Sequence, residues 1–206
     1  GIRDDLVTGV QTCALPICLY AGSNSQATRG IAIGSDSGCN LQSQDAIAIG
    51  YASALNNQAS NAIAIGPSAA KDNQGSNSVA IGYKTGGFNQ KSNSVALGSY
   101  AGSNQQGIDS VALGTYAGSN EQGNYSIAVG KEAANTSQGT QSVAIGFGAG
   151  RSNQGSTAIA IGGAGQTSQG NYSIALGFAA GGYNQTSNSI AMGYQAGNNT
   201  QGTKSI

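Results

Sequence analysis

The sequence predicts an all-β protein, a single-domain parallel β-solenoid of about 11–12 coils with 16 residues in each coil. Three observations lead to this prediction. A tetrapeptide first seen as Ile31-Ala32-Ile33-Gly34 returns at a regular spacing along the chain. Its residues alternate between aliphatic and small side chains, as in a β-strand. The residues between the copies also recur in register, so each copy is one stacked unit of a repeat protein.

The glycine that ends each tetrapeptide measures the period. These glycines are Gly34, Gly50, Gly66, Gly82, Gly98, Gly114, Gly130, Gly146, Gly162, Gly177 and Gly193. All spacings are 16 residues except the spacing of 15 between Gly162 and Gly177, where we expect the ladder to be locally disturbed. Ser205 and Ile206 begin a further copy. We therefore expect a repeat domain over residues 18–206 that is truncated within a repeat.

Residues 1–17 differ in kind from the repeat. They contain Pro16 and Cys13, and position 18, where the repeat expects glycine, is Cys18. The stretch VTGVQTCALPI resembles the conceptual translation of a sequencing adapter. On that interpretation residues 1–17 are an artefact and Cys18 is a junction residue; the alternative is a natural linker or cap.

The recurring five-residue motif has two faces of opposite character. In Ser126-Ile127-Ala128-Val129-Gly130, Ile127 and Val129 point to one side, and the small residues point to the other. The middle of the small face is alanine in every complete copy: Ala32, Ala48, Ala64, Ala80, Ala96, Ala112, Ala128, Ala144, Ala160, Ala175 and Ala191. The sequence does not indicate which of the two faces lies inside the coil.

The other half of each unit, written G-x-x-A-G, predicts a short second strand or bend with glycine at its corners. A glutamine stands before the next strand in every copy: Gln42, Gln58, Gln74, Gln90, Gln106, Gln122, Gln138, Gln154, Gln169, Gln185 and Gln201. Stacked amides can hydrogen-bond from coil to coil, so we interpret this column as a ladder that sets the register. The alternative interpretation is a row of amides that binds a ligand.

A coil of this size has a thin core. Two aliphatic residues contribute roughly 1.5–3 kcal/mol each when fully buried. Ordering the backbone costs on the order of 1–2 kcal/mol per residue. Burial of a second face would offset part of this deficit, so we expect the chain to form homo-oligomers through whichever face is left outside.

Several copies of the motif resemble the head repeat of YadA-like trimeric autotransporter adhesins. They are Ser78-Val79-Ala80-Ile81-Gly82, Ser94-Val95-Ala96-Leu97-Gly98 and Ser142-Val143-Ala144-Ile145-Gly146. The resemblance covers residues 19–206 and implies a left-handed parallel β-roll of three chains side by side, displayed on a bacterial surface or a viral fibre. The period of 16 and the N-Q-G segment depart from the minimal family motif. The resemblance also implies that this chain is a head only, attached to the outer membrane through a part that lies outside it.

Composition argues against several function classes. The eight acidic and eight basic residues are spread thinly, which does not favour nucleic acid as a partner. Histidine is absent from the sequence, which removes the commonest general base and metal ligand. No apolar run approaches the roughly 20 residues of a membrane-spanning helix. We therefore expect no catalysis, no cofactor, no metal and no membrane span in this fragment.

Aromatic residues are the chemically richest surface feature that the sequence predicts. Tyr51, Tyr83 and Tyr194 directly follow a motif glycine, whereas Tyr100 and Tyr116 come one position later. Because alternate positions point to opposite faces, we expect at most two partial rows. The rows could contact sugars or protein partners, or they could pack turns of neighbouring coils together.

The function predicted from these observations is structural and adhesive. The head would form a homotrimer and bind a host surface protein, a matrix protein or a glycan at the cell surface. A phage or giant-virus fibre protein is one alternative. An ice-binding solenoid is another, although threonine is scattered here rather than aligned in one row.

Overall fold

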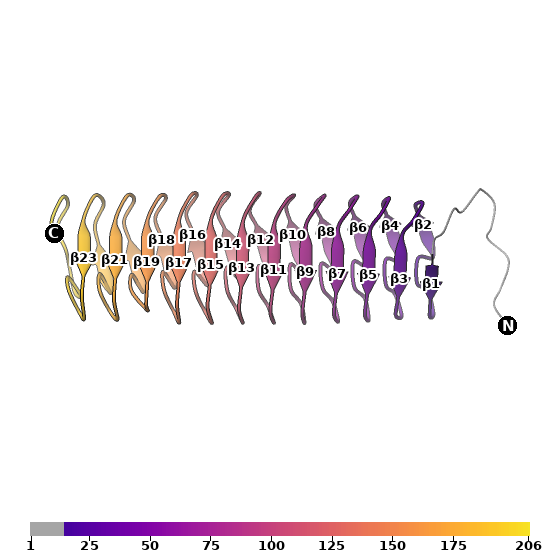
Figure 1. The fold of residues 1–206 in the computed structure, drawn as a ribbon, viewed down its shortest axis with the longest axis horizontal. Coiled ribbons are helices and arrows are strands. Elements are labelled where there is room, and N and C mark those ends of the chain that lie inside the picture. The colour runs from indigo at the N-terminus through magenta and orange to yellow at the C-terminus, as the bar shows by residue number, and fades with distance from the viewer. Residues whose placement is uncertain (1–14) are drawn as a thin grey trace.

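The computed structural model describes residues 15–206 and shows a parallel β-solenoid in which each full turn contributes one strand to each of two sheets. The coils follow one another along a single axis from the N-terminal to the C-terminal end (Figure 1). One sheet has 12 strands and the other has 11, and every pairing in both is parallel. The described residues contain no helix. The fold class predicted from the repeat is therefore confirmed.

The 12-stranded sheet, called sheet A, contains the aliphatic-alanine-aliphatic tripeptides. Its strands are β1 (Leu15–Ile17), β3 (Ile31–Ile33), β5 (Ile47–Ile49), β7 (Ile63–Ile65), β9 (Val79–Ile81), β11 (Val95–Leu97), β13 (Val111–Leu113), β15 (Ile127–Val129), β17 (Val143–Ile145), β19 (Ile159–Ile161), β21 (Ile174–Leu176) and β23 (Ile190–Met192).

The 11-stranded sheet, called sheet B, contains the tripeptides that end in glutamine. Its strands are β2 (Asn24–Gln26), β4 (Asn40–Gln42), β6 (Asn56–Gln58), β8 (Asp72–Gln74), β10 (Phe88–Gln90), β12 (Asn104–Gln106), β14 (Asn120–Gln122), β16 (Thr136–Gln138), β18 (Ser152–Gln154), β20 (Thr167–Gln169) and β22 (Tyr183–Gln185).

Equivalent residues of successive coils pair directly. In sheet A, Ala96 pairs with Ala112, and in sheet B, Gln106 pairs with Gln122. The backbone hydrogen bonds run along the rod axis; for example, the Val111 N–H donates to the Ser126 carbonyl at 2.9 Å. A parallel ladder of this kind satisfies the peptide groups of every inner coil without any contact to another chain.

The small face of sheet A is the one that lies inside the coil. The alanine column is completely buried from Ala32 to Ala175, and Ala191 near the C-terminal end is 2 % exposed. A second buried alanine column at the corner after sheet A, represented by Ala101, Ala117 and Ala133, packs against it. Sixteen residues enclose a narrow interior, so methyl groups fill it where aliphatic side chains would not fit. The aliphatic residues therefore point outward.

The regular coil also extends upstream of position 18. Leu15 pairs with Ile31 and Ile17 pairs with Ile33, so β1 continues the register of sheet A. Cys18 occupies the column of the motif glycines and adopts a φ of 105°. The remainder of the segment interpreted as an artefact or linker, residues 1–14, lies outside the described residues.

The 15-residue unit does not disturb the strand ladders, which corrects the expectation drawn from its spacing. Ile159 still pairs with Ile174, and Gln154 still pairs with Gln169. The corner after β19 is one residue shorter than the others. It consists of residues 162–166, whereas the corresponding corner of the preceding coil consists of residues 146–151. The shortened corner keeps backbone bonds to both neighbouring coils, since the Gly162 N–H donates to Ile145 O and the Gly165 N–H donates to Ala180 O.

Each coil turns its corners with residues in the left-handed region of backbone space. One such position lies two residues before sheet A, where the column includes Asn61, Asn77, Asn93 and Thr157 at φ values of 56–59°. Asparagine tolerates this conformation, whereas a β-branched residue is strained in it. The frequent asparagines of the sequence thus have a local backbone role.

Replacing Thr157 by asparagine should stabilise the coil, because Thr157 is exposed and β-branched at a φ of 56°. We expect a gain on the order of 1 kcal/mol in the free energy of unfolding. The reciprocal change, Asn188→Thr, affects an exposed residue of the same column at a φ of 59° and should destabilise. Chemical denaturation of both variants measures the effect; a destabilised Thr157→Asn variant or a stabilised Asn188→Thr variant would contradict this account of the turns.

Candidate interaction surfaces

The glutamine column lies inside the coil rather than on the surface. Gln90 and Gln106 are 0–1 % exposed. Each Nε2 crosses the interior and donates to a sheet A carbonyl: Gln90 to Val79 O at 2.9 Å, and Gln106 to Val95 O at 2.9 Å. Buried in this way, the row offers no amide to a surface ligand, and its bonds tie sheet B to sheet A.

The bond from glutamine to glutamine is less regular than the bond across the coil. It joins successive coils from Gln26 through Gln106, where Gln90 Nε2 donates to Gln106 Oε1 at 3.0 Å. Farther along, the buried Oε1 atoms of Gln122, Gln138, Gln169 and Gln185 have no hydrogen-bond partner. Gln122 nevertheless keeps its bond to Val111 O at 2.8 Å. The bridge between the two sheets is therefore the constant element of the ladder.

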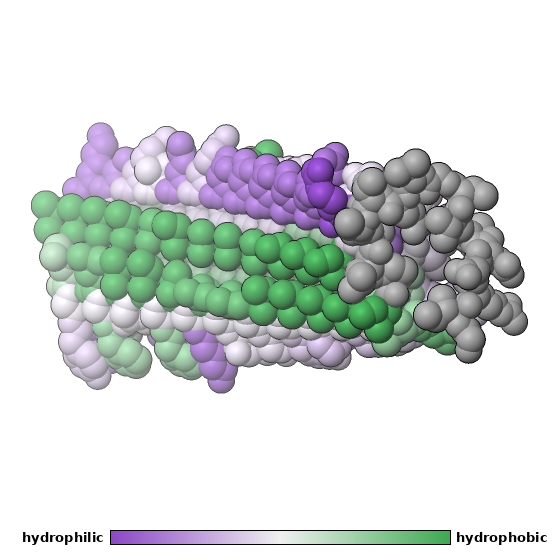
Figure 2. Space-filling model, turned by 45° about the vertical axis from the view of Figure 1, so that its right-hand side comes forward, coloured by the Kyte–Doolittle hydropathy of each residue, from purple (hydrophilic) through white to green (hydrophobic). Residues whose placement is uncertain are grey.

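The outer face of sheet A carries two columns of aliphatic side chains. Representative residues are only partly covered: Val95 is 37 % exposed, Leu97 39 % and Ile127 37 %. Figure 2 shows hydrophobic side chains gathered in parallel stripes that run along the rod beside hydrophilic bands. Soluble monomers rarely expose so continuous an apolar patch, and such patches mark interaction sites.

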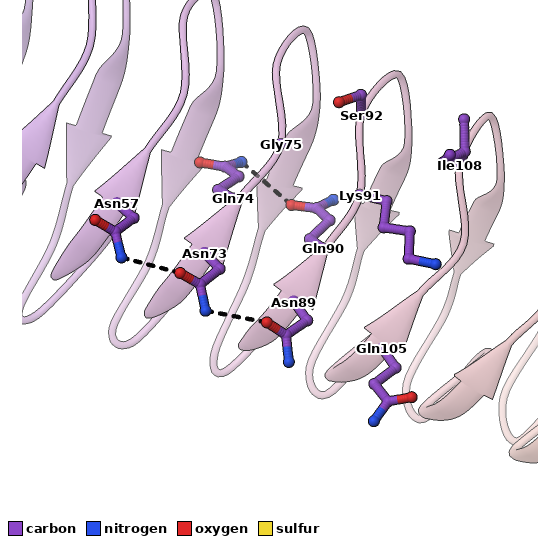
Figure 3. Close-up of a pocket in the computed structure, with 10 residues that line it drawn as sticks. All are labelled: Asn57, Asn73, Gln74, Gly75, Asn89, Gln90, Lys91, Ser92, Gln105 and Ile108. Atoms are coloured by element: carbon purple, nitrogen blue, oxygen red, sulfur yellow. Dashed lines mark hydrogen bonds between the residues drawn. The ribbon is translucent and has the colours of Figure 1, made fainter.

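The outer face of sheet B is polar and contains a groove of about 580 Å³. Asn57 Nδ2 donates to Asn73 Oδ1 at 3.0 Å, and Asn73 donates in the same way to Asn89. Figure 3 shows these amides in a row along the groove, with Lys91 at the neighbouring turn. The amides bond mainly to one another, so they lend rigidity to the surface more than they offer free donors.

The aromatic residues form a cluster between coils rather than two separate rows. The ring centroids of Tyr83 and Tyr100 are 5.4 Å apart in an edge-to-face arrangement, and those of Tyr100 and Tyr116 are 4.9 Å apart and stacked. The alternation expected for a strand does not apply, because these positions lie in a turn where Tyr100 has a φ of 57°. Tyr194 stacks on Phe178 at 5.9 Å, and Tyr51 is 61 % exposed.

A lysine lies against this aromatic cluster. Lys84 Nζ is 5.3 Å from the ring centroid of Tyr83 and 5.6 Å from that of Tyr100. Its hydrogen bond to Tyr83 and its attraction to the Tyr100 and Tyr83 side chains raise the pKa of Lys84 above its usual value. The ammonium group is therefore a permanent positive charge beside two aromatic rings.

Elsewhere in the described residues, ion pairs form at two places. Arg29 Nη2 donates to Asp45 Oδ2 at 2.6 Å, and this hydrogen bond holds the pKa of Asp45 below its usual value. Arg151 and Lys131 both lie near Glu132, at 3.1 and 3.8 Å. Residues 15–206 contain no group of three or more histidine, cysteine or acidic residues arranged to hold a metal ion. In the same residues, no helix is long and apolar enough to cross a bilayer.

Comparison with known families adds to this geometry. Residues 106–133 and 133–149 match the model of the YadA head domain repeat, in two copies. The solenoid resembles a YadA head. The matched copies lie in the middle of the rod, and the parallel β-solenoid around them has the repeat architecture expected of a YadA-like head. Searches of curated proteins and of solved structures returned no match.

Over these residues the chain is similar to the repeat of a YadA head domain. The surfaces that the rod offers to a partner are its outer faces. They comprise the aliphatic columns of sheet A, the amide groove of sheet B and the aromatic cluster at the corners.

The buried bridge can be tested by replacing Gln90 with leucine. This change removes the donor to the Val79 carbonyl and to Gln106 Oε1, both of which accept from Gln90 Nε2 in the coil interior. We expect a loss of about 1–3 kcal/mol in the free energy of unfolding. Gln44→Leu, at an exposed position, is the control and should change stability by less than about 0.5 kcal/mol. Equal effects of the two changes in chemical denaturation would contradict the bridge.

Proposed function

We propose that this chain is the head of a trimeric surface adhesin, or of a virion fibre of the same build, that binds a host surface protein, a matrix protein or a glycan. In this assembly the aliphatic columns of sheet A form the surface that the three copies share. The outer face of sheet B and the corners remain available to the host ligand.

The observation that carries the proposal is the reversal of the usual burial pattern in sheet A. Alanine is buried at 0 % exposure, for example at Ala112 and Ala128, while their larger aliphatic neighbours Leu113 and Ile127 are 38 % and 37 % exposed. Burying those side chains in an interface would add roughly 25 cal/mol for each Å² removed from water. A second chain supplies the hydrophobic burial that a single coil has no room for.

The geometry of the columns favours a closed assembly of identical chains. Each column runs parallel to the rod axis, with one aliphatic residue per coil, as in Val95, Val111 and Ile127. Rotating a copy about an axis parallel to the rod brings the same coil of each copy to the same height. Cyclic symmetry therefore aligns all coils at once and leaves no free interface. The number three comes from the resemblance to YadA-like heads.

Native mass spectrometry tests this proposal directly, and the expected mass is that of a trimer. Leu113→Glu places a carboxylate in the aliphatic column at a residue that is 38 % exposed in the single chain. In a symmetric trimer three such charges would face the same interface, so we expect at least about a tenfold weaker association.

The control for this experiment is Thr136→Glu, an exposed position in sheet B. It adds the same charge on the other side of the coil and should leave the trimer intact. Far-ultraviolet circular dichroism should show the same strand content for all three proteins, since the coil core is untouched. A wild-type chain that remains monomeric at micromolar concentration would overturn the proposal.

A further inference from the structure

A second groove lies where the aromatic cluster meets the start of sheet B. It has a volume of about 500 Å³ and is lined by Ser68, Lys71, Lys84, Gly87, Phe88, Tyr100, Ser103 and Asn104. These residues come from the corners and strand starts of three successive coils. The volume lies within the usual range for pockets that hold small ligands.

The walls of this groove include aromatic rings whose positions are set before any ligand binds. Tyr100 is held between Tyr83 and Tyr116 by the ring contacts at 5.4 and 4.9 Å. Phe88, at the first position of β10, is 48 % exposed. A ring face carries partial negative charge, so it attracts C–H groups that carry partial positive charge. One face of a pyranose ring presents such C–H groups.

The positive charges of the groove are not neutralised by the chain itself. Within residues 15–206, neither Lys71 nor Lys84 forms an ion pair with a carboxylate. Asp72 follows Lys71 directly, and its Oδ1 accepts a hydrogen bond from Asn56 Nδ2 at 2.6 Å but forms no ion pair with Lys71. Neither ammonium group is therefore paired with a carboxylate of the described residues, and the contacts of Lys84 are to aromatic rings.

The polar lining adds hydrogen-bonding groups at the same place. Asn104 is exposed at the start of β12, and its side chain makes no hydrogen bond within the described part of the chain. Ser68 lies at the opposite side, in the corner before β8. In contrast, the amides of the sheet B groove are engaged in bonds such as that from Asn57 to Asn73. The aromatic groove thus presents Asn104 and Ser68 to a ligand with hydroxyls.

We propose that the groove between Lys71, Lys84, Phe88 and Tyr100 binds an acidic oligosaccharide. The C–H face of a sugar ring packs on the exposed ring of Phe88, with the Tyr100 side chain as the adjoining wall, and its carboxylate or sulfate is held by the two lysines. Ring hydroxyls bond with Asn104 and Ser68. This inference rests on the proposed function for its setting, a host surface rich in such sugars, and it specifies which of the proposed ligands the head recognises.

The test uses the whole chain and a chondroitin sulfate tetrasaccharide, with isothermal titration calorimetry as the measurement. Chitotetraose, which is neutral, and a tetraglutamate peptide are titrated in parallel. The formal net charge of the chain is zero, so non-specific attraction to the anionic sugar is small. We expect the acidic sugar to bind, the neutral sugar to bind at least about tenfold more weakly, and the peptide to bind more weakly than the acidic sugar.

Two variants locate the site. Lys84→Gln should weaken binding of the acidic sugar about tenfold and reduce its dependence on salt concentration. Phe88→Ala should also weaken it, because the sugar loses its aromatic platform. Lys204→Gln and Tyr172→Ala are the controls, since both residues are exposed and lie outside the groove. Thermal unfolding of each variant checks that the coil is intact; Lys84→Gln, whose side chain is exposed, provides the decisive comparison.

The outcomes separate this inference from the proposed function. Because the groove lies within one chain, sugar binding can be measured whether or not the chain forms a trimer. A trimer that does not bind the acidic sugar, or binds it unchanged after Lys84→Gln, overturns the inference and leaves the head assembly standing. Equal binding of the neutral sugar, or tighter binding of tetraglutamate, also overturns it. A monomeric chain that binds the sugar through Lys84 supports the inference and contradicts the trimer.

Discussion

The hydrogen bond that crosses the inside of each coil, from a glutamine amide to a sheet A carbonyl, is the interaction on which the two sheets depend. The interior between them is lined by alanine methyl groups, which provide little hydrophobic burial. Gln106 bonds Val95 O at 2.9 Å, and an equivalent bond recurs in coil after coil. A glutamine side chain is long enough to reach from sheet B to sheet A, and an unpaired amide in this interior would lower the stability of the coil. The narrow coil is thus closed by a polar bridge.

This closure moves the hydrophobic groups to the outside. Since alanine and glutamine occupy the interior, residues such as Val111 and Leu113 have only the outer face of sheet A to point to. The same tripeptide therefore has two roles. Its alanine packs inside the coil, and its flanking residues form a continuous apolar stripe on the outer face of sheet A. In a globular domain one core performs both roles. Here the flanking aliphatic residues stay on the outer face of sheet A, which explains why a repeat so regular has an apolar surface.

The period, the strands and the parallel register could be predicted from the sequence. A 16-residue repeat that contains a segment with period-2 alternation forms one strand per turn at the same place, so that successive strands stack in parallel. The sequence did not decide which face of Ile127-Ala128-Val129 is buried. The alternation is the same whether the alanine or the aliphatic side chains lie inside the coil, and only the width of the coil interior decides between the two arrangements. The sequence left two interpretations of the aromatic residues open, contact with partners or packing between neighbouring turns, and the contact between Tyr83 and Tyr100 is of the second kind. Both residues lie in a corner, and at Tyr100 the left-handed backbone breaks the alternation that holds in strands. The pairing of Leu15 with Ile31 was hidden because Pro16 and Cys18 replace the usual alanine and glycine.

The corners tolerate change where the strands do not, and this difference places sequence variety on the surface. The 15-residue unit loses its residue between Ile161 and Thr167 while both ladders continue in register. At the corner position two residues after the motif glycine, successive coils carry Ser68, Lys84, Tyr100 and Tyr116 without altering the backbone, whose φ stays at 52–58°. Ser68 is small, whereas Lys84 and Tyr100 at the same position of the next two coils are large. The aromatic groove lies at this change in side-chain size. A rod of similar coils thus acquires a local groove by changing side chains at a corner position whose backbone conformation stays the same.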